Sequence, residues 1–369
     1  MSPHAQPPAR QHAPKHARKH EKSTSREPAA LKNALRILLL LLAVAAFGWL
    51  VRGADPEAVA QSLAALGFWA PLVPLPYLAV YLVDTVGWWK AFGRGGPEGI
   101  SYGVLFRIRW MGESINNFAP SAYVGGEAVK VYLLAKRGLS ASSATASVVI
   151  AKTLQMLGYL IFLAIGALGT LHLLGDSVPV LGTLLSSIAL TTVLVAVLFW
   201  VQRRGPFGLL LRTFERFGWH SRRLEAQREN LLDVDQRIVA FYRDDRGAFR
   251  ASLGAFTAGW LLDTLEIFLV AGWMDVPLSW NQALVIEAFT RVAKAAGVVV
   301  PGAIGVQEAG IVLMCRFAGA PDAFGISYAV LRRGREALYA AVGWLLLIAE
   351  ESHLSQLRER LAQSSSGDP

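Results

Sequence analysis

The stretch PSAYVGGEA occupies residues 120–128, and a related stretch, PGAIGVQEA, occupies residues 301–309. Each begins with a proline, contains glycine, and carries a glutamate seven residues after the proline, at Glu127 and Glu308. Both stretches lie within strongly apolar sequence, where proline and glycine interrupt helices. The residues expected to break the helices are Pro120, Gly125, Gly126, Pro301, Gly302 and Gly305.

The similarity extends beyond these two stretches. The tetrapeptide LVDT (residues 82–85) matches LLDT (residues 261–264), Gly138 matches Gly319, and Lys152 matches Arg333. Repeated, interrupted membrane segments are typical of secondary transporters, whose binding sites form where the breaks meet near the bilayer midplane. The repeat therefore predicts a transporter-like architecture.

The composition is that of a membrane protein. Of the 369 residues, 53% are hydrophobic and 17% are charged, whereas soluble domains carry about 25% charged residues. Cys315 is the only cysteine, which excludes an internal disulfide and paired-cysteine metal or redox motifs. The net charge of +9 is concentrated in the N-terminal tail and a central segment, which fits the positive-inside rule better than nucleic-acid binding. We expect no nucleic-acid partner, no metal and no cofactor.

The predicted fold class is an all-α polytopic integral membrane protein with an inverted internal repeat. It comprises about six full transmembrane helices, at residues 35–51, 71–92, 143–171, 178–201, 253–274 and 324–350. Residues 102–137 and 281–318 are too charged for simple spans and too apolar for loops, so they are predicted to form two re-entrant helical hairpins. The first hairpin is expected to enter from the cytoplasm and the second from the opposite side. One extra or missing crossing would make the repeats parallel.

The chain divides into five predicted segments. These are a disordered basic cytoplasmic tail (1–30), a first transmembrane half (31–202), a cytoplasmic amphipathic connector (203–249), a second transmembrane half (250–350) and a cytoplasmic tail (351–369). In the connector, Leu231, Val234, Ile238 and Phe241 share one helical face. This face could lie on lipid headgroups or pack onto the bundle, and the sequence leaves both open.

Charged side chains recur inside the apolar segments, where each is costly unless it is paired or faces a cavity. Three pairs are spaced to neutralise each other on one helix: Arg109–Glu113, Glu287–Arg291 and Arg332–Glu336. Lys152 and Arg333 are expected to lack an acidic neighbour one turn away.

We therefore hypothesise a polar track that binds a phosphorylated or otherwise anionic headgroup. Arginine grips phosphate through its planar fork, and lysine acts as a mobile point charge. A glutamate could receive a headgroup amine or carry a coupling proton. The predicted substrate-binding residues are Arg109, Glu127, Lys130, Lys152, Arg291, Glu308, Arg332 and Arg333.

The two repeated stretches resemble the flippase-like, lysylphosphatidylglycerol synthase transmembrane family. The run from Arg107 to Asn117, together with Gly125 to Gly138, is similar to the branch associated with hopanoid biosynthesis. The resemblance covers roughly residues 32–350 and implies a multi-pass protein of the bacterial inner membrane with a cytoplasmic N-terminus. The synthases of this family carry a soluble aminoacyl-transferase domain after the membrane part, so lysyl transfer is not implied here.

The resulting functional hypothesis is a lipid translocase rather than an enzyme. It would move a polar or anionic lipid between leaflets, with a link to hopanoid or aminoacylated phospholipid metabolism. No zinc-protease motif or P-loop occurs in the sequence. Two alternatives stay open: a non-transporting scaffold for lipid-synthesis enzymes, and an intramembrane transferase acting on a polyprenyl-phosphate lipid. The expected partners are a membrane lipid and lipid-biosynthesis enzymes, and the oligomeric state is not predicted.

Overall fold

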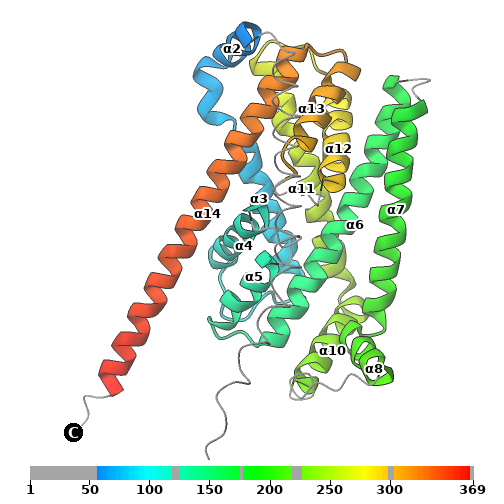
Figure 1. Ribbon diagram of the computed structural model, residues 1–369. Helices are drawn as coiled ribbons and strands as arrows, with labels where there is room; N and C mark the ends of the chain where they lie inside the picture. The colour runs from blue at the N-terminus through cyan, green and yellow to red at the C-terminus, as the bar shows by residue number, and fades with distance from the viewer. Residues whose placement is uncertain (1–55, 119–124, 175–177, 218–226, 298–302, 366–369) are drawn as a thin grey trace, which may run out of the picture.

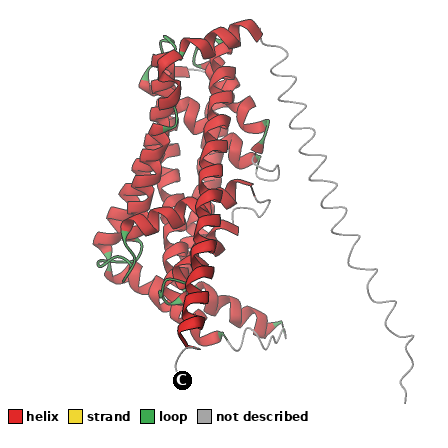
Figure 2. Ribbon diagram, turned by 90° about the vertical axis from the view of Figure 1, so that its left-hand side faces the viewer, coloured by secondary structure: helices red, strands yellow, loops and turns green. Residues whose placement is uncertain are grey.

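The computed structural model describes residues 56–118, 125–174, 178–217, 227–297 and 303–365 (Figure 1). Within these ranges the regular structure is helical and contains no strand (Figure 2). The predicted first span, the basic tail, Pro120, Pro301 and Gly302 lie outside the described residues. The chain is an all-α polytopic membrane protein, as its sequence predicted.

The helices follow one another in a simple order. They are α2 (Pro56–Ala65), the 3-10 helix η1 (Gly67–Leu72), α3 (Leu75–Lys90), α4 (Tyr102–Phe118), α5 (Gly125–Ala135), α6 (Ala141–Leu174), α7 (Val178–Arg203), α8 (Pro206–Arg216), α10 (Arg228–Asp244), α11 (Arg246–Trp273), α12 (Trp280–Ala296), α13 (Val306–Phe317) and α14 (Asp322–Ser365). Four segments in the described part of the chain are long and apolar enough to cross a membrane: Gly67–Lys90, Ala141–Thr170, Leu185–Gln202 and Arg246–Trp273. The 44-residue α14 is also long enough at 1.5 Å per residue, but charged side chains interrupt its apolar sequence.

The pairs α4–α5 and α12–α13 form two helical hairpins that enter the bundle from opposite ends (Figure 1). Phe92 after α3, Ser143 at the start of α6 and Arg237 of α10 line one cavity, so the first hairpin begins and ends on the side of α10. At the other end, Trp69 stacks on Trp273 with ring centroids 5.7 Å apart. The second hairpin starts there, directly after α11. This arrangement is an inverted repeat.

Equivalent helices of the two halves meet at the centre of the molecule. The helix α3 packs along α11, its counterpart in the repeat, and Ser252 donates a hydrogen bond to the Gly87 carbonyl at 2.7 Å. Around this pair, α4 packs against α14, and α12 packs against α6. Because α4 corresponds to α12 and α14 to α6, these two contacts are related by the repeat. Each hairpin therefore lies between the central pair and the long helix of the other half.

Two apolar cores each centre on one half of the molecule, and each also includes residues of the other half. One core gathers around Trp88, Ile108 and Leu154, and the other gathers around Ile267 and Tyr328. A third core joins α6 of the first half to α12 of the second, so the two halves are also packed against each other.

The connector contains α8 and α10, which lie together at one end of the bundle (Figure 1). Val234, Ile238 and Phe241 of α10 are buried in the first core. Asp235 accepts hydrogen bonds from the backbone N–H groups of Phe207 at 3.0 Å and Gly208 at 2.6 Å, which caps α8. The sequence left open whether the apolar face of α10 lies on lipid headgroups or packs onto the bundle. In the structure it packs onto the bundle.

Three segments differ from the sequence expectation. Residues 56–65 form α2 and residues 67–72 form η1, largely between the first two predicted spans, and α11 begins seven residues before the predicted span. The last helix continues through Ser365, past the predicted end at residue 350. Its C-terminal part is polar but rich in Glu, Leu, Gln and Arg, which are good helix formers. The apolar pattern thus marks a membrane crossing, and a helix can continue beyond it.

Candidate functional site

The first polar contact joins the first hairpin to the central helix pair. Arg109 of α4 and Asp84 of α3 form an ion pair at 2.5 Å, and both side chains are buried. Gln155 of α6 donates to the same carboxylate at 3.4 Å. A Cβ at Gly259 of α11 would collide with Asp84, so this carboxylate lies directly against the other half of the molecule.

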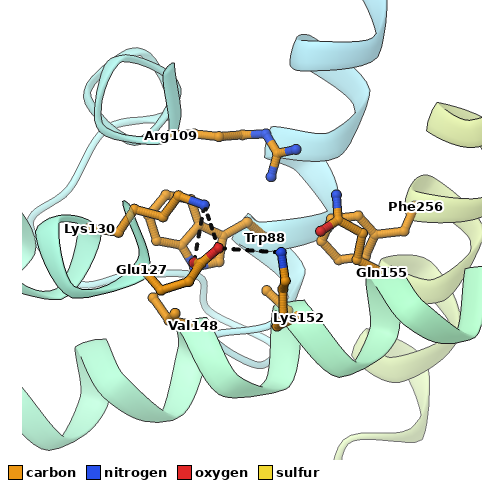
Figure 3. Close-up of a pocket in the computed structure, with 9 residues that line it drawn as sticks. Trp88, Arg109, Glu127, Lys130, Val148, Lys152, Gln155 and Phe256 are labelled. Carbon is orange, nitrogen blue, oxygen red and sulfur yellow. Dashed lines mark hydrogen bonds and ion pairs between the residues drawn. The ribbon is translucent and has the colours of Figure 1, made fainter. Parts of the chain in front are cut away.

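A second set of contacts links the hairpin helices to each other and to α6 (Figure 3). Lys130 of α5 bonds to Glu113 of α4 at 2.7 Å and to Glu127 at 3.1 Å. Glu127 also accepts a hydrogen bond from Asn116 at 3.3 Å. Lys152 of α6 lies 3.5 Å from Glu127. The carboxylate of Glu127 therefore connects the hairpin with the long helix beside it.

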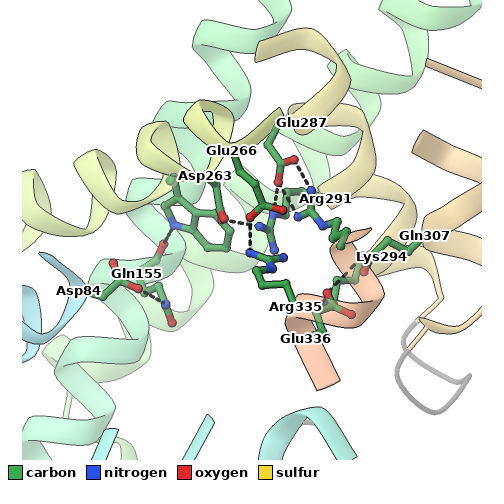
Figure 4. A network of polar contacts seen from close by, with 12 residues as sticks. Asp84, Gln155, Asp263, Glu266, Glu287, Arg291, Lys294, Gln307, Arg335 and Glu336 are labelled. Atoms are coloured by element: carbon green, nitrogen blue, oxygen red, sulfur yellow. Dashed lines mark hydrogen bonds and ion pairs between the residues drawn. The ribbon is translucent and has the colours of Figure 1, made fainter. Parts of the chain in front are cut away.

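The second half contains a largely buried ionic group (Figure 4). Arg291 of α12 pairs with Asp263 of α11 and donates from Nε to Glu287 at 2.7 Å. Arg332 of α14 holds both oxygens of Glu287, at 2.5 and 2.8 Å. Next to it, Arg335 pairs with Glu266 at 2.7 Å.

The second hairpin is also tied to its long helix. Arg333 of α14 pairs with Glu308 of α13 and, at 2.7 Å, with Glu336. Glu308 accepts a hydrogen bond from the Gly305 N–H at 2.6 Å. Lys294 of α12 lies 3.1 Å from Glu336. These contacts close the second hairpin against α14 as Glu127 and Lys152 do in the first half.

Two kinds of ion pair thus recur in the two halves. Asp84–Arg109 corresponds to Asp263–Arg291, each joining a central helix to the first helix of a hairpin. Glu127–Lys152 corresponds to Glu308–Arg333, each joining the second helix of a hairpin to a long helix. The repeat is therefore preserved in the contacts as well as in the sequence.

These interior ionic groups balance in charge. The acidic members are Asp84, Glu113, Glu127, Asp263, Glu266, Glu287, Glu308 and Glu336, and the basic members are Arg109, Lys130, Lys152, Arg291, Lys294, Arg332, Arg333 and Arg335. Eight negative charges face eight positive charges. Burial of any one of them alone would be strongly unfavourable, so mutual pairing makes the set tolerable.

The contacts correct part of the sequence interpretation. Of the three pairs expected on single helices, only Glu287–Arg291 forms. Arg109 pairs with Asp84 instead of Glu113, and Arg332 pairs with Glu287 instead of Glu336. The physical reason is that a carboxylate on an adjacent helix faces each of these guanidinium groups more directly than the carboxylate one turn away on the same helix.

The expectation of no acidic neighbour one turn away holds for Lys152 but was wrong for Arg333. Lys152 meets Glu127 from a different helix. Arg333 meets Glu308 from α13 and also Glu336, three residues further along its own helix. Both cations are partly exposed, at 33% and 27% of their side-chain surface, whereas Arg332 is 1% exposed.

The glycines of the hairpins serve different purposes. Gly126 lies against the Gly112 carbonyl and the Asn116 side chain, with no room for a Cβ, and its N–H donates to Asn116 at 2.8 Å. It permits close helix approach. Gly305 has a φ of 86° and precedes α13, so it turns the chain into that helix. Gly125 is the first residue of α5.

Several residues of the network were missing from the predicted site. The aspartates Asp84 and Asp263 could have been found, because they lie in the matching tetrapeptides at residues 82–85 and 261–264. Glu266 and Arg335 carry no repeat signal, since their partnership depends on how α11 and α14 pack. Gln155, opposite Asp84, is likewise visible only in the structure.

A small cavity lies where the first set of contacts faces α6 and α11. Its walls include Arg109, Glu127, Lys130, Lys152 and Gln155 (Figure 3). The cavity volume is about 10 Å³, which is about enough for one water molecule. A larger polar group could enter only if the surrounding helices moved apart.

Comparison with known proteins gives the family. Residues 34–343 match the model of the lysylphosphatidylglycerol synthase transmembrane region. The chain belongs to this family. This membership covers both halves, both hairpins and the whole interior ionic network.

The chain is also similar to archaeal membrane proteins. It is 22% identical over 270 residues to a UPF0104 membrane protein of Pyrococcus horikoshii, covering 69% of this chain and 80% of that protein. It is 24% identical over 238 residues to a UPF0104 membrane protein of Methanothermobacter thermautotrophicus, covering 62% of this chain and 70% of that protein. These similarities and the apolar helices establish a membrane protein of a family connected with lipid metabolism.

Proposed function

We propose that the protein is a lipid translocase that moves a polar or anionic lipid between the two leaflets of the bacterial inner membrane. The observation that carries the proposal is the repeated bridge between a hairpin and a long helix, Glu127–Lys152 in one half and Glu308–Arg333 in the other. Inverted repeats with interrupted helices support alternating access by rocking one half against the other. The N-terminus, the connector and the C-terminal segment would face the cytoplasm, where the connector's arginines satisfy the positive-inside rule.

The lipid headgroup would enter by replacing one member of each ion pair in these bridges. A phosphate can replace Glu127 on Lys152 or Glu308 on Arg333, and a headgroup amine can take the released carboxylate. Because the interior charges are balanced, such an exchange leaves no charge unpaired when the headgroup carries both a phosphate and an amine. The partial exposure of Lys152 and Arg333 makes them the accessible members of the network.

A row of polar and aromatic contacts between the Asp84–Arg109 and Asp263–Arg291 ion pairs supports passage from one half to the other. Gln155 lies between Asp84 and Trp260, because it donates to Asp84 at 3.4 Å and its carbonyl accepts from the Trp260 ring at 3.0 Å. Arg291 lies over the same ring, 5.3 Å from its centroid. The narrow cavity beside Lys152 suits a closed state of this path, which would widen when the halves rock.

The test is a leaflet-accessibility assay with purified protein in liposomes. The lipids tested are phosphatidylglycerol, lysylphosphatidylglycerol, phosphatidylethanolamine and an amine-bearing hopanoid. They cover both aminoacylated phospholipids and hopanoids. We expect wild-type protein to accelerate exchange of at least one of them. Lys152→Ala and Arg333→Ala should each slow this exchange about tenfold, equivalent to about 1.4 kcal/mol, at unchanged protein level. Arg316→Ala, at an exposed ion pair, is the control and should exchange normally.

The double variant Glu127→Lys/Lys152→Glu distinguishes a role of the bridge in headgroup binding from a role in holding the hairpin against α6. It keeps an ion pair but moves the cation, so headgroup exchange should stay slow. Full recovery of exchange would show that the bridge only holds the hairpin and would overturn the binding role. Unchanged leaflet distribution for every lipid with wild-type protein would favour a scaffold, and a new lipid species would favour a transferase.

A further inference from the structure

A second cavity lies away from the ionic network, where α7, α10 and α11 meet. Its volume is about 430 Å³, and its walls are formed by Phe199, Tyr242, Arg246, Phe249 and Arg250. None of these residues takes part in the interior ion pairs described above. The cavity lies at the end of the bundle that holds the connector, next to the last turn of α7 and the first turns of α11.

The two arginines in this cavity have no acidic partner among the described residues. Arg246 and Arg250 are one turn apart at the start of α11, where like charges repel and the helix dipole also disfavours cations. Both are exposed, and within the described part of the chain neither forms an ion pair. The neighbouring Asp245 instead pairs with Arg94 at 2.9 Å. The site therefore has an unfavourable pair of cations whose natural complement is an anion.

The aromatic residues give the cavity a fixed apolar wall. The Tyr242 ring lies 5.0 Å from Phe199 and 6.1 Å from Phe249, both edge to face. The Tyr242 hydroxyl donates to Gln202 at 2.7 Å, and Gln202 donates in turn to Thr153 of α6. Because Tyr242 is held from within the bundle, the wall is formed before any ligand arrives.

The surface of α7 leads from the lipid region to this cavity. Its exposed side chains are apolar along the helix and include Leu190, Val193, Leu194, Val197 and Trp200. Arg204 lies over the Trp200 ring at 4.2 Å, and an aromatic and a basic residue together at a helix end are typical of the membrane–water interface. An acyl chain lying along α7 would bring its headgroup to the cavity.

We propose that this cavity binds one anionic phospholipid of the adjacent leaflet, independently of the translocation path. Arg246 and Arg250 bind the phosphodiester through charge-assisted hydrogen bonds. The glycerol and the first part of an acyl chain lie against Phe199, Tyr242 and Phe249. Basic pockets between membrane helices at an interface are suited to such lipid headgroups. The lipid ties α7 to the start of α11 across the connector.

The experiment compares thermal unfolding of the full-length protein in nanodiscs of phosphatidylcholine alone and of phosphatidylcholine with phosphatidylglycerol. Ligand that binds only the folded state raises the unfolding temperature. We expect phosphatidylglycerol to raise it for the wild type and for Arg246→Lys/Arg250→Lys. The variant Arg246→Gln/Arg250→Gln should lose at least half of this increase while unfolding like the wild type in phosphatidylcholine. Native mass spectrometry should show one retained phosphatidylglycerol on the wild type and none on this variant.

The matched control is Arg107→Gln/Arg216→Gln, which removes two exposed arginines that do not line the cavity. It should keep the full phosphatidylglycerol effect. An equal loss in this control would assign the effect to general surface charge and overturn the site, as would a full effect in Arg246→Gln/Arg250→Gln. Stabilisation of the wild type by inorganic phosphate in phosphatidylcholine nanodiscs, at the same level, would overturn the assignment to a lipid.

Discussion

Glu287 connects two arginines in the interior of the second half. Its side chain is fully buried, and its two oxygens accept hydrogen bonds from Arg291 at 2.7 Å and from Arg332 at 2.5 and 2.8 Å. The carboxylate is therefore the shared partner of two buried guanidinium groups. Replacing both partners by apolar groups could be tolerated, but removing one partner of a buried ionic group leaves the others uncompensated.

We expect Glu287→Gln to destabilise the protein by about 3–5 kcal/mol, because Arg332 loses its charged partner in a dry environment. Chemical unfolding in detergent micelles measures the change. Asp322→Asn is the matched control, since it breaks the Arg316–Asp322 pair at the exposed end of the hairpin, and it should cost within about 1 kcal/mol. Equal effects of the two substitutions would contradict the role assigned to burial.

The first hairpin is held together by backbone proximity as much as by charge. Gly126 of α5 lies against the Gly112 carbonyl of α4, and small residues allow such close approach between membrane helices. The Lys130–Glu113 bond crosses the same contact at 2.7 Å. Separating the two helices would therefore break the Lys130–Glu113 bond as well.

Gly126→Ala should destabilise the protein by about 1–3 kcal/mol, because the added methyl group overlaps the facing backbone and the hairpin must open. It should also slow lipid exchange in liposomes. Gly103→Ala on α4 is the control, since no atom lies within 4 Å of its added methyl group. Thermal unfolding of the two variants side by side measures the difference, and comparable melting temperatures would show that α4 and α5 are not in contact as described.

The sequence predicts the helices more fully than it predicts the contacts of single side chains. Hydropathy and the repeated PSAYVGGEA and PGAIGVQEA stretches predicted both hairpins and the spans at α3, α6, α7 and α11, because apolar length and helix breakers are local properties. The partners of Arg109, Lys152 and Arg332 were not predicted, because each lies on another helix. Packing over the whole bundle decides which helices are neighbours, and one amino-acid sequence does not show directly which helices these are.

The molecule as a whole consists of two halves that face opposite ways. Ser140 and Pro321 are equivalent positions, each immediately before a long helix, α6 or α14. Both are exposed. Since α6 starts at the α10 end and α14 at the other end (Figure 1), the two positions belong to opposite sides of the membrane.

This placement predicts the outcome of labelling with a membrane-impermeant maleimide. Ser140→Cys should react only from the connector side in sealed vesicles, and Pro321→Cys only from the other side. The native Cys315 is buried and should label only after unfolding, so the unmodified chain is the background control. Reaction of both variants from the same side would make the repeats parallel and would contradict the inverted arrangement.

The charge balance of the interior has a consequence for energetics across the bilayer. A transmembrane voltage acts on net charge moved through the field, at about 2.3 kcal/mol per charge per 100 mV. Eight carboxylates and eight cations that shift together contribute almost nothing to that sum. Any current measured during the transport cycle would then come from the net charge of the transported lipid. A zwitterionic lipid would produce no current, and an anionic lipid would produce one.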